Sequence, residues 1–135
     1  MRALFLVPLL ALAACDTTNS YDSEDAVVVD GVVLATDRSV YGVGDEATLT
    51  LRNRGRRTAE TGALGCAGVE RRTAGGWTQD VAFNQDRYCI AILHVVSPGD
   101  EIEAAVPLDG IEAGTYRFVH EVNDRPVATA AFSIR

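Results

Sequence analysis

The chain has 135 residues, a formal net charge of −7 and 47% hydrophobic residues, which suits one folded domain with its own apolar core. This acidic balance argues against nucleic acid or an anionic membrane surface as an electrostatic partner. All 12 basic residues are arginine, so mechanisms that need a lysine, such as Schiff-base chemistry, are excluded.

The N-terminus begins with Met1 and Arg2 and continues with an unbroken apolar run over residues 3–14. This run is too short to span a bilayer, which needs about 20 apolar residues. The next segment, residues 16–25, is polar and does not extend it. A charged start followed by a short apolar run is typical of an export signal that is removed from the mature protein.

The end of this run, Leu12-Ala13-Ala14-Cys15, resembles the lipobox of bacterial lipoproteins. The resemblance implies a signal peptide over residues 1–14, cleavage before Cys15, and lipid with palmitate-type acyl chains on that cysteine. Two or three such chains hold a protein at a membrane almost permanently. The implied location is the bacterial cell envelope, at the inner or the outer membrane. The alternative is an ordinary secretory signal beside a chance cysteine.

Residues 15–25 are rich in Asp, Thr, Asn, Ser and Glu, with Tyr21 as their single aromatic residue. Such a segment cannot bury enough apolar surface to fold alone. The composition therefore predicts a disordered acidic tether of about ten residues between the membrane and the folded domain.

From residue 26 to residue 135 the sequence alternates between short β-prone runs and clusters of Gly, Pro, Asn and Asp. The pattern predicts an all-β domain, an antiparallel sandwich of about 7 to 8 strands. The hairpin around Gly75 and Gly76 is the clearest predicted pairing. The expected strands cover residues 27–35, 46–53, 68–73, 77–83, 88–96, 101–108, 115–122 and 127–134.

Alternation predicts which strand faces point inward, because successive side chains of a strand lie on opposite faces. The apolar members of residues 47–52 fall on one face and the polar members on the other. In the seventh strand, Tyr116, Phe118, His120 and Val122 share one face. We expect this face to point into the core.

Cys66 and Cys89 remain as an even pair once Cys15 is assigned to lipid. In an exported protein such a pair predicts a disulfide. For a separation of 23 residues, chain entropy suggests a stabilisation of roughly 3 kcal/mol.

Five short motifs lie in order along residues 38–135. Together they resemble the skeleton of a bacterial immunoglobulin-like domain, which implies an Ig-like β-sandwich with a non-catalytic binding or structural role. Within it Tyr116 resembles the tyrosine of a tyrosine corner, whose hydroxyl bonds upstream backbone. The motifs are Ser39-x-Tyr41-x-x-Gly44-Asp45, Leu49-x-Leu51-x-Asn53, Trp77, Pro98-Gly99-Asp100 and Gly114-x-Tyr116-Arg117.

The cysteines depart from the antibody pattern, since Leu49 or Leu51 and Phe118 occupy the positions of the usual bridge between sheets. A similar skeleton occurs in a small family of bacterial proteinase inhibitors with an Ig-like fold. That resemblance implies the alternative function, an inhibitor with an exposed, ordered loop. The candidate loops are residues 58–65 and 84–87.

Two groups of side chains are candidates for binding. Arg52, Arg54 and Arg56 would place three guanidinium groups on one side if their strand stayed extended through Gly55. That arrangement suits an anionic ligand or acidic partner, or a charged edge that discourages sheet pairing. Trp77 suits either an exposed anchor for a partner or sugar, or a cover over one end of the core.

No arrangement of residues predicts catalysis or a cofactor. His94, Ser97 and Asp100 follow one strand and its exit turn, where they are not expected to converge. His94 and His120 lack the spacing of a metal site, and the acidic loops do not match an EF-hand, although calcium stays open. We therefore expect no enzyme, no metal and no nucleic-acid partner, but a membrane anchor and an envelope protein or ligand as partner.

Overall fold

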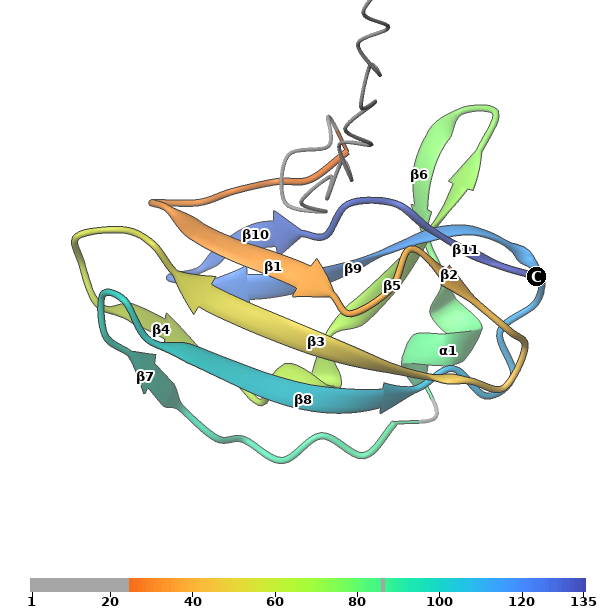
Figure 1. Ribbon diagram of the computed structural model, residues 1–135. Helices are drawn as coiled ribbons and strands as arrows, with labels where there is room; N and C mark the ends of the chain where they lie inside the picture. The colour runs from red at the N-terminus through yellow and green to blue at the C-terminus, as the bar shows by residue number, and fades with distance from the viewer. Residues whose placement is uncertain (1–24, 86) are drawn as a thin grey trace, which may run out of the picture.

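The computed structural model describes residues 25–85 and 87–135 (Figure 1). The predicted signal peptide, Cys15 and residues 15–24 of the predicted tether lie outside the described residues. No helix in the described part is long and apolar enough to cross a membrane.

The described chain folds into two layers of strands, which confirms the predicted all-β sandwich (Figure 1). The smaller sheet has the order β1-β3-β8, and the larger runs β2-β11-β9-β4-β7, with β10 and β5 also paired to β9 and β6 paired to β5. The pairs are antiparallel except β2 with β11. The elements are β1 Val32–Thr36, β2 Val40–Tyr41, β3 Glu46–Asn53, β4 Ala59–Thr61, a 3₁₀ turn η1 Leu64–Cys66, β5 Gly68–Thr73, β6 Gly76–Gln79, α1 Val81–Gln85, β7 His94–Val96, β8 Glu101–Pro107, β9 Gly114–Val122, β10 Arg125–Ala128 and β11 Phe132–Ile134.

The core lies between the two sheets and follows the predicted alternation. Leu49 and Leu51 of β3 are fully buried, as are Tyr116 and Phe118 of β9. The Phe132 ring stacks on Phe118 at 5.1 Å between ring centroids. His120 departs from the prediction, because it is only half-buried although Phe118 and Val122 on either side of it in the core-facing row of β9 are fully buried.

The strand predicted over residues 27–35 is confirmed only from Val32 onward, because the chain turns sharply at Asp30 and Gly31. Both residues have positive φ, 50° and 79°, and the Val32 N–H donates to the Val29 carbonyl at 2.7 Å. Asp-Gly favours this two-residue turn. As a result Val27 pairs with Ala128 of the larger sheet, whereas β1 pairs with β3 of the smaller one.

Three other predicted strands are shorter than expected. The run over 77–83 ends at Gln79, because Asp80 caps α1 by accepting the Phe83 N–H at 3.1 Å. In the run over 88–96 only β7 is a strand. The run over 127–134 divides into β10 and β11 at Thr129, whose hydroxyl accepts the Phe118 N–H.

The remaining strand predictions agree with the structure. Residues 46–53 and 68–73 have the predicted bounds, and residues 101–108 and 115–122 differ by one residue at one end. The predicted hairpin is confirmed, with Thr73 opposite Gly76.

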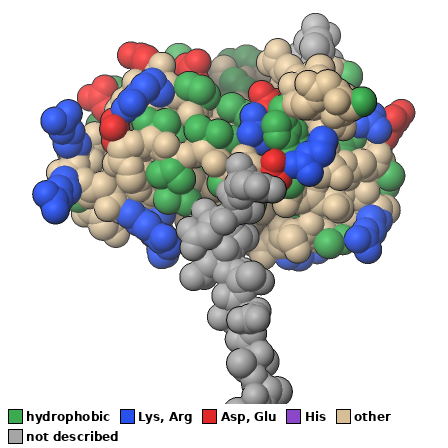
Figure 2. All heavy atoms as spheres, turned by 90° about the horizontal axis from the view of Figure 1, so that it is seen from above, with side chains coloured by type: hydrophobic (Ala, Val, Ile, Leu, Met, Phe, Trp, Pro, Cys, Tyr) green, Lys and Arg blue, Asp and Glu red, His purple; other side chains and the backbone are tan. Residues whose placement is uncertain are grey.

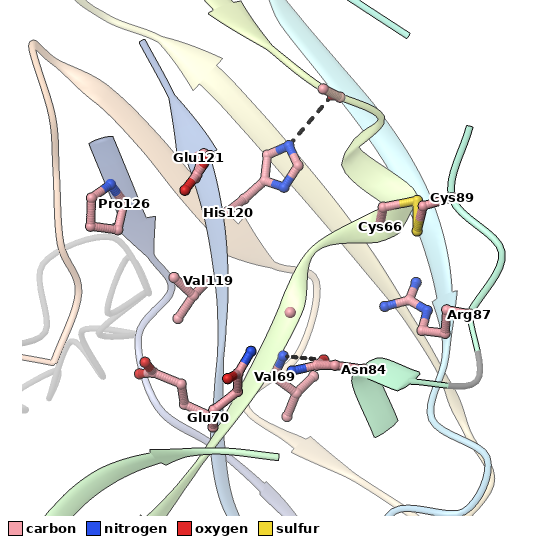
Figure 3. A pocket seen from close by; sticks show the side chains of 13 residues that line it. Cys66, Val69, Glu70, Asn84, Arg87, Cys89, Val119, His120, Glu121 and Pro126 are labelled. Atoms are coloured by element: carbon pink, nitrogen blue, oxygen red, sulfur yellow. Dashed lines mark hydrogen bonds between the residues drawn. A yellow bond between two sulfur atoms is a disulfide. The ribbon is translucent and has the colours of Figure 1, made fainter. Parts of the chain in front are cut away.

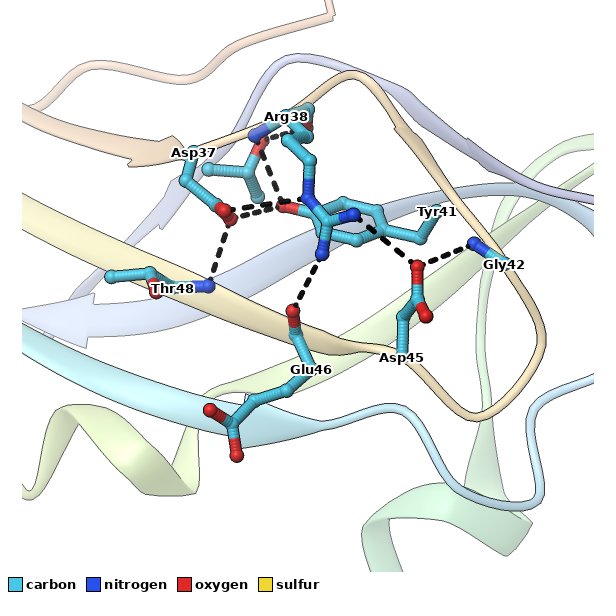
Figure 4. Close-up of polar contacts among 8 residues, drawn as sticks. Asp37, Arg38, Tyr41, Gly42, Asp45, Glu46 and Thr48 are labelled. Carbon is cyan, nitrogen blue, oxygen red and sulfur yellow. Dashed lines mark hydrogen bonds and ion pairs between the residues drawn. The ribbon is translucent and has the colours of Figure 1, made fainter.

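The motif that runs from Ser39 to Asp45 forms a polar network at one end of the sandwich (Figure 4). The Tyr41 hydroxyl donates to Asp37 at 2.6 Å, and the Thr48 N–H donates to the same oxygen at 2.9 Å. Asp45 accepts the Gly42 N–H at 2.8 Å. Burial raises the pKa of Asp37, but these hydrogen bonds outweigh it and hold the pKa below its ordinary value. The motif therefore stabilises the fold.

Candidate functional site

Five of the nine exposed large apolar side chains in the described part of the chain lie in residues 88–95, called here the apolar edge. The exposed fractions of its large side chains are 92% for Tyr88, 52% for Ile90, 40% for Ile92, 67% for Leu93 and 60% for Val95. The segment contains no Asp, Glu, Lys or Arg. Figure 1 shows it crossing the lower side of the molecule, below β8, before it enters β7. Exposed apolar surface is a common feature of interaction sites, so the apolar edge is the candidate site.

Both ends of the apolar edge are fixed to the fold. At its start the predicted disulfide between Cys66 and Cys89 is confirmed, with 5.8 Å between the Cα atoms. Beside it the Arg87 guanidinium donates to the Ala67 carbonyl at 2.7 Å and to the Gly65 carbonyl. Burial lowers the pKa of Arg87. At its far end β7 pairs with β4.

The outer side of β7 presents backbone groups without a strand neighbour in the described part of the chain. Glu60 of β4 directs its backbone toward β9, because its N–H donates to the Asn123 side chain and its carbonyl accepts the Asn123 N–H, both at 2.9 Å. Val95 lies opposite Glu60. Backbone groups of an antiparallel ladder alternate in direction, so the N–H and carbonyl of Val95 point away from β4.

A hollow of about 560 Å³ lies beside the disulfide, on the outer face of the larger sheet (Figure 3). Asn84 accepts the Val69 N–H at 3.1 Å, and its Nδ2 is buried without a hydrogen-bond partner among the described residues. The His120 ring points toward the Gly62 carbonyl, at 3.4 Å, and burial lowers the pKa of His120. Arg87 is already bonded to backbone. The hollow thus offers one amide donor without a hydrogen-bond partner among the described residues.

Trp77 lies on the outer face of the larger sheet, where it is partly exposed. Its ring is held between the guanidinium groups of Arg72 and Arg117, each 4.7 Å from the ring centroid. Both arginines bind Asp25, Arg72 through the carboxylate and Arg117 through the carbonyl at 3.0 Å. Trp77 therefore belongs to a clamp on the segment by which the chain enters the domain.

Figure 2 shows basic, acidic and apolar side chains interspersed on the face seen from above, without a patch of one charge sign.

The three predicted arginines do not line one side of a strand. β3 ends at Asn53, and the Gly55 N–H donates back to the Asn53 side chain at 2.9 Å. Arg54 and Arg56 therefore lie in the following turn rather than in a continued strand. Arg52 bonds Glu101 across the sheet, with 2.7 Å from Nε to the carboxylate. Because the strand does not stay extended through Gly55, the three guanidinium groups do not form a row on one side of it.

The two segments predicted as inhibitor loops are held against the fold at several of their described residues. Within residues 58–65, Ala59 and Thr61 are buried in β4, and Leu64 is buried in η1. Within residues 84–87, Asn84 belongs to α1 and Arg87 is held by the backbone of residues 65 and 67. The neighbouring apolar edge, predicted as part of a strand over residues 88–96, is exposed over residues 88–93.

The candidate residues for catalysis and metal binding make structural contacts in β7 and the turn that follows it. His94 pairs with Thr61 in β7, and the Asp100 N–H closes a turn onto the Ser97 carbonyl at 3.0 Å. Over residues 25–85 and 87–135 no group of three or more His, Cys, Asp and Glu side chains is placed to hold a metal ion.

Comparison with known proteins identifies the fold. The family model described as the bacterial Ig-like domain matches residues 29–133. No curated protein matches the chain. Among solved structures, the chain is similar to Pseudomonas fluorescens alkylpurine DNA glycosylase AlkC bound to DNA containing an abasic site analog, with 11% identity and a TM-score of 0.46. The match covers 80% of this chain and 31% of that one.

Proposed function

Because the chain belongs to the family of bacterial Ig-like domains, we propose that it is a non-catalytic binding domain held at the cell envelope by lipid on Cys15. The observation that carries the proposal is the apolar edge, a run of exposed apolar side chains fixed at both ends. We propose this edge as the surface that contacts other envelope components.

The topology of the larger sheet supports an anchor on the side away from this surface. Val27, just after the predicted tether, pairs with β10, and the order across the sheet is then β10, β9, β4 and β7. Four strand spacings correspond to roughly 19 Å. The chain thus enters at one edge of the sheet, and the apolar edge lies at the other.

The anchor is tested by replacing the cysteine that would carry the lipid. The full chain and its Cys15→Ser variant are produced in a bacterium, and membranes are partitioned between a detergent phase and an aqueous phase. We expect the full chain in the detergent phase and the variant in the aqueous phase, because the acyl chains supply the membrane affinity. Identical partitioning of the two proteins would contradict the anchor.

The binding surface is tested by a photo-crosslinking residue at Leu93 in intact cells. Val43, 64% exposed on the turn after β2, is the matched control for Leu93 at 67%. We expect a discrete adduct from position 93 and none from position 43. Equal labelling at both positions, or none at either, counts against the apolar edge as a contact surface.

A second candidate function is inhibition of a proteinase. It is favoured by one observation: residues 88–93 are exposed and are held by a disulfide at one end and a paired strand at the other. Such a segment suits the extended form in which proteases bind peptides. Titration of a broad protease panel at equimolar ratio tests this function. Stoichiometric inhibition of one enzyme supports it, and activity of the whole panel rules it out.

A further inference from the structure

Among the described residues, the outer side of β7 has no strand neighbour and is therefore open to strand pairing. Natural edge strands are usually protected by charged residues, proline or a covering segment. Residues 88–96 contain no charged residue and no proline, and β7 ends the strand order of the larger sheet in the described part. We propose that β7 pairs with β7 of a second copy of this chain, joining the two larger sheets edge to edge.

The backbone of β7 is suited to a two-fold pairing. The N–H and carbonyl of Val95 both point outward, because Glu60 opposite them bonds toward β9. In an antiparallel pair centred on Val95, each copy donates its Val95 N–H to the other's carbonyl. The same strand surface serves both copies, as an isologous interface requires.

The side chains favour a second copy over a charged partner. Leu93 and Val95 lie two residues apart and therefore on the same face, and their exposed fractions are 67% and 60%. Self-pairing centred on Val95 sets the two Val95 side chains opposite each other, and each Leu93 then lies diagonal to the Val95 of the other copy. The pairing places no like charges opposite each other in residues 88–96, although the whole chain carries a net charge of −7.

The chain's entry point is compatible with two copies on one membrane. The two-fold axis of an antiparallel strand pair runs perpendicular to the sheet, so the outer faces of both larger sheets point in the same direction. Asp25 is held on this outer face by Arg72 and Arg117. Both tethers then leave on the same side. This step rests on the proposed lipid anchor, whereas the pairing of β7 does not.

Cysteine crosslinking in the full chain tests the pairing. In Val95→Cys the two introduced thiols would lie opposite each other, within reach of a disulfide. Oxidation should give a dimer whose crosslinked peptide contains residue 95 from both copies and which reductant returns to monomer. The equally exposed control, Val43→Cys, should stay monomeric. No dimer from position 95, or equal dimer from both positions, overturns the proposal.

Light scattering of the purified full chain in a non-ionic detergent gives a second measurement that needs no crosslink. We expect the full chain to have the protein mass of a dimer. Val95→Lys should have half that mass, because two charges would face each other in the pair. Val43→Lys should have the same mass as the full chain. A monomeric full chain overturns the proposal. If the adduct from position 93 contains another envelope protein and no second copy, the binding function stands and self-pairing is wrong.

Discussion

His120 occupies a core-facing position of β9 but lies at the rim of the hollow, with Glu121 beside it. Burial lowers the pKa of His120, and the Gly62 carbonyl and the Glu121 charge oppose this effect without cancelling it. The unfolded chain therefore binds a proton more readily than the fold. The resulting contribution to stability is present above about pH 6.5, the ordinary value for histidine, and is lost as the pH falls toward the lower pKa of the folded state.

We therefore expect His120→Gln to flatten the fall in the free energy of unfolding between neutral and mildly acid pH. The measurement is urea unfolding of the protein and the variant at several pH values. His94→Gln is the control. The same pH dependence in the protein and in His120→Gln would show that His120 is not its source.

Tyr116 acts through its hydroxyl, which donates to the Glu112 carbonyl at 2.7 Å. This contact confirms the tyrosine corner expected from Gly114-x-Tyr116. Tyr116→Phe should lower the free energy of unfolding by about 1 kcal/mol, the usual net value of one such bond. Tyr88→Phe is a matched control, because Tyr88 is 92% exposed. Equal stability of Tyr116→Phe and the unchanged protein in thermal unfolding would remove the corner as a stabilising feature.

The role of a residue could be predicted where its contacts lie close to it along the chain. Tyr116 bonds a carbonyl four residues upstream, so a short motif is enough to suggest its role. Trp77 packs between Arg72 of the adjacent strand and Arg117 of β9, and both bind Asp25. Their contacts span most of the domain, and no short sequence pattern records them. The sequence therefore indicated Trp77 as notable but not what surrounds it.

At the scale of elements, two turns meet where β1 begins and β3 ends. The Arg54 N–H donates to the Gly31 carbonyl at 2.9 Å, and a Cβ on Gly55 would lie 2.1 Å from the Asp30 carbonyl oxygen. Gly55→Ala should therefore lower the free energy of unfolding by about 2 kcal/mol, a typical cost of overpacking. Gly75→Ala is the control, since its nearest neighbour would be 3.9 Å away. Similar unfolding midpoints for both variants would contradict this steric argument.

The disulfide fixes the start of the apolar edge to η1. Replacing both cysteines, Cys66→Ser with Cys89→Ser, should lower the free energy of unfolding by about 3 kcal/mol if loop closure dominates. Residues 88–93 should then be cut faster by a protease under native conditions, because Cys89 no longer holds them. Denaturant unfolding and mass spectrometry of timed digests measure the two effects. Unchanged cleavage in this segment would mean that Arg87 and β7 suffice to hold it.

Strand prediction succeeded where alternation was present and failed where it was not. The run of Ala47 to Arg52 alternates strictly and forms β3 as expected. The run of Ile90 to Leu93 is apolar throughout, a pattern shared by a buried strand and an exposed binding segment. Which of the two forms depends on what covers the run, and that depends on sheet order. The Asp30-Gly31 turn, by contrast, has a local signal, the Asp-Gly pair itself. The apolar residues on both sides of it suggested one continuous strand instead.

On the scale of the whole molecule, the resemblance of short motifs was enough to predict the sandwich, because those motifs are turns and core positions. It was not enough to predict the strand order. β9 pairs with β11, β10, β5 and β4 along its length. This branching separates the entry point at Val27 from the apolar edge across the larger sheet. The candidate site is a product of that arrangement.

Asn53 joins the two sheets and shows how the apolar edge depends on the whole fold. It is fully buried at the end of β3, and its Nδ2 donates to the Val96 carbonyl of β7 at 2.9 Å and to the Arg57 carbonyl at 2.7 Å. Asn53→Ala would leave both carbonyls without this donor. At about 1 to 3 kcal/mol for each unsatisfied buried group, we expect a loss of roughly 3 kcal/mol in the free energy of unfolding. Thr50→Ala, on the exposed face of the same strand, is the control.

Hydrogen exchange distinguishes a general loss of stability from a local one. Because the Asn53 side chain bonds the Val96 carbonyl of β7, Asn53→Ala should raise amide exchange in β7 and β4 more than in β1, which pairs with the backbone of β3. If self-pairing holds β7, the dimer should also weaken in this variant, although Asn53 lies away from the outer side of the strand. Uniform exchange across both sheets, with the dimer intact, would mean that Asn53 stabilises the sandwich without positioning its edge.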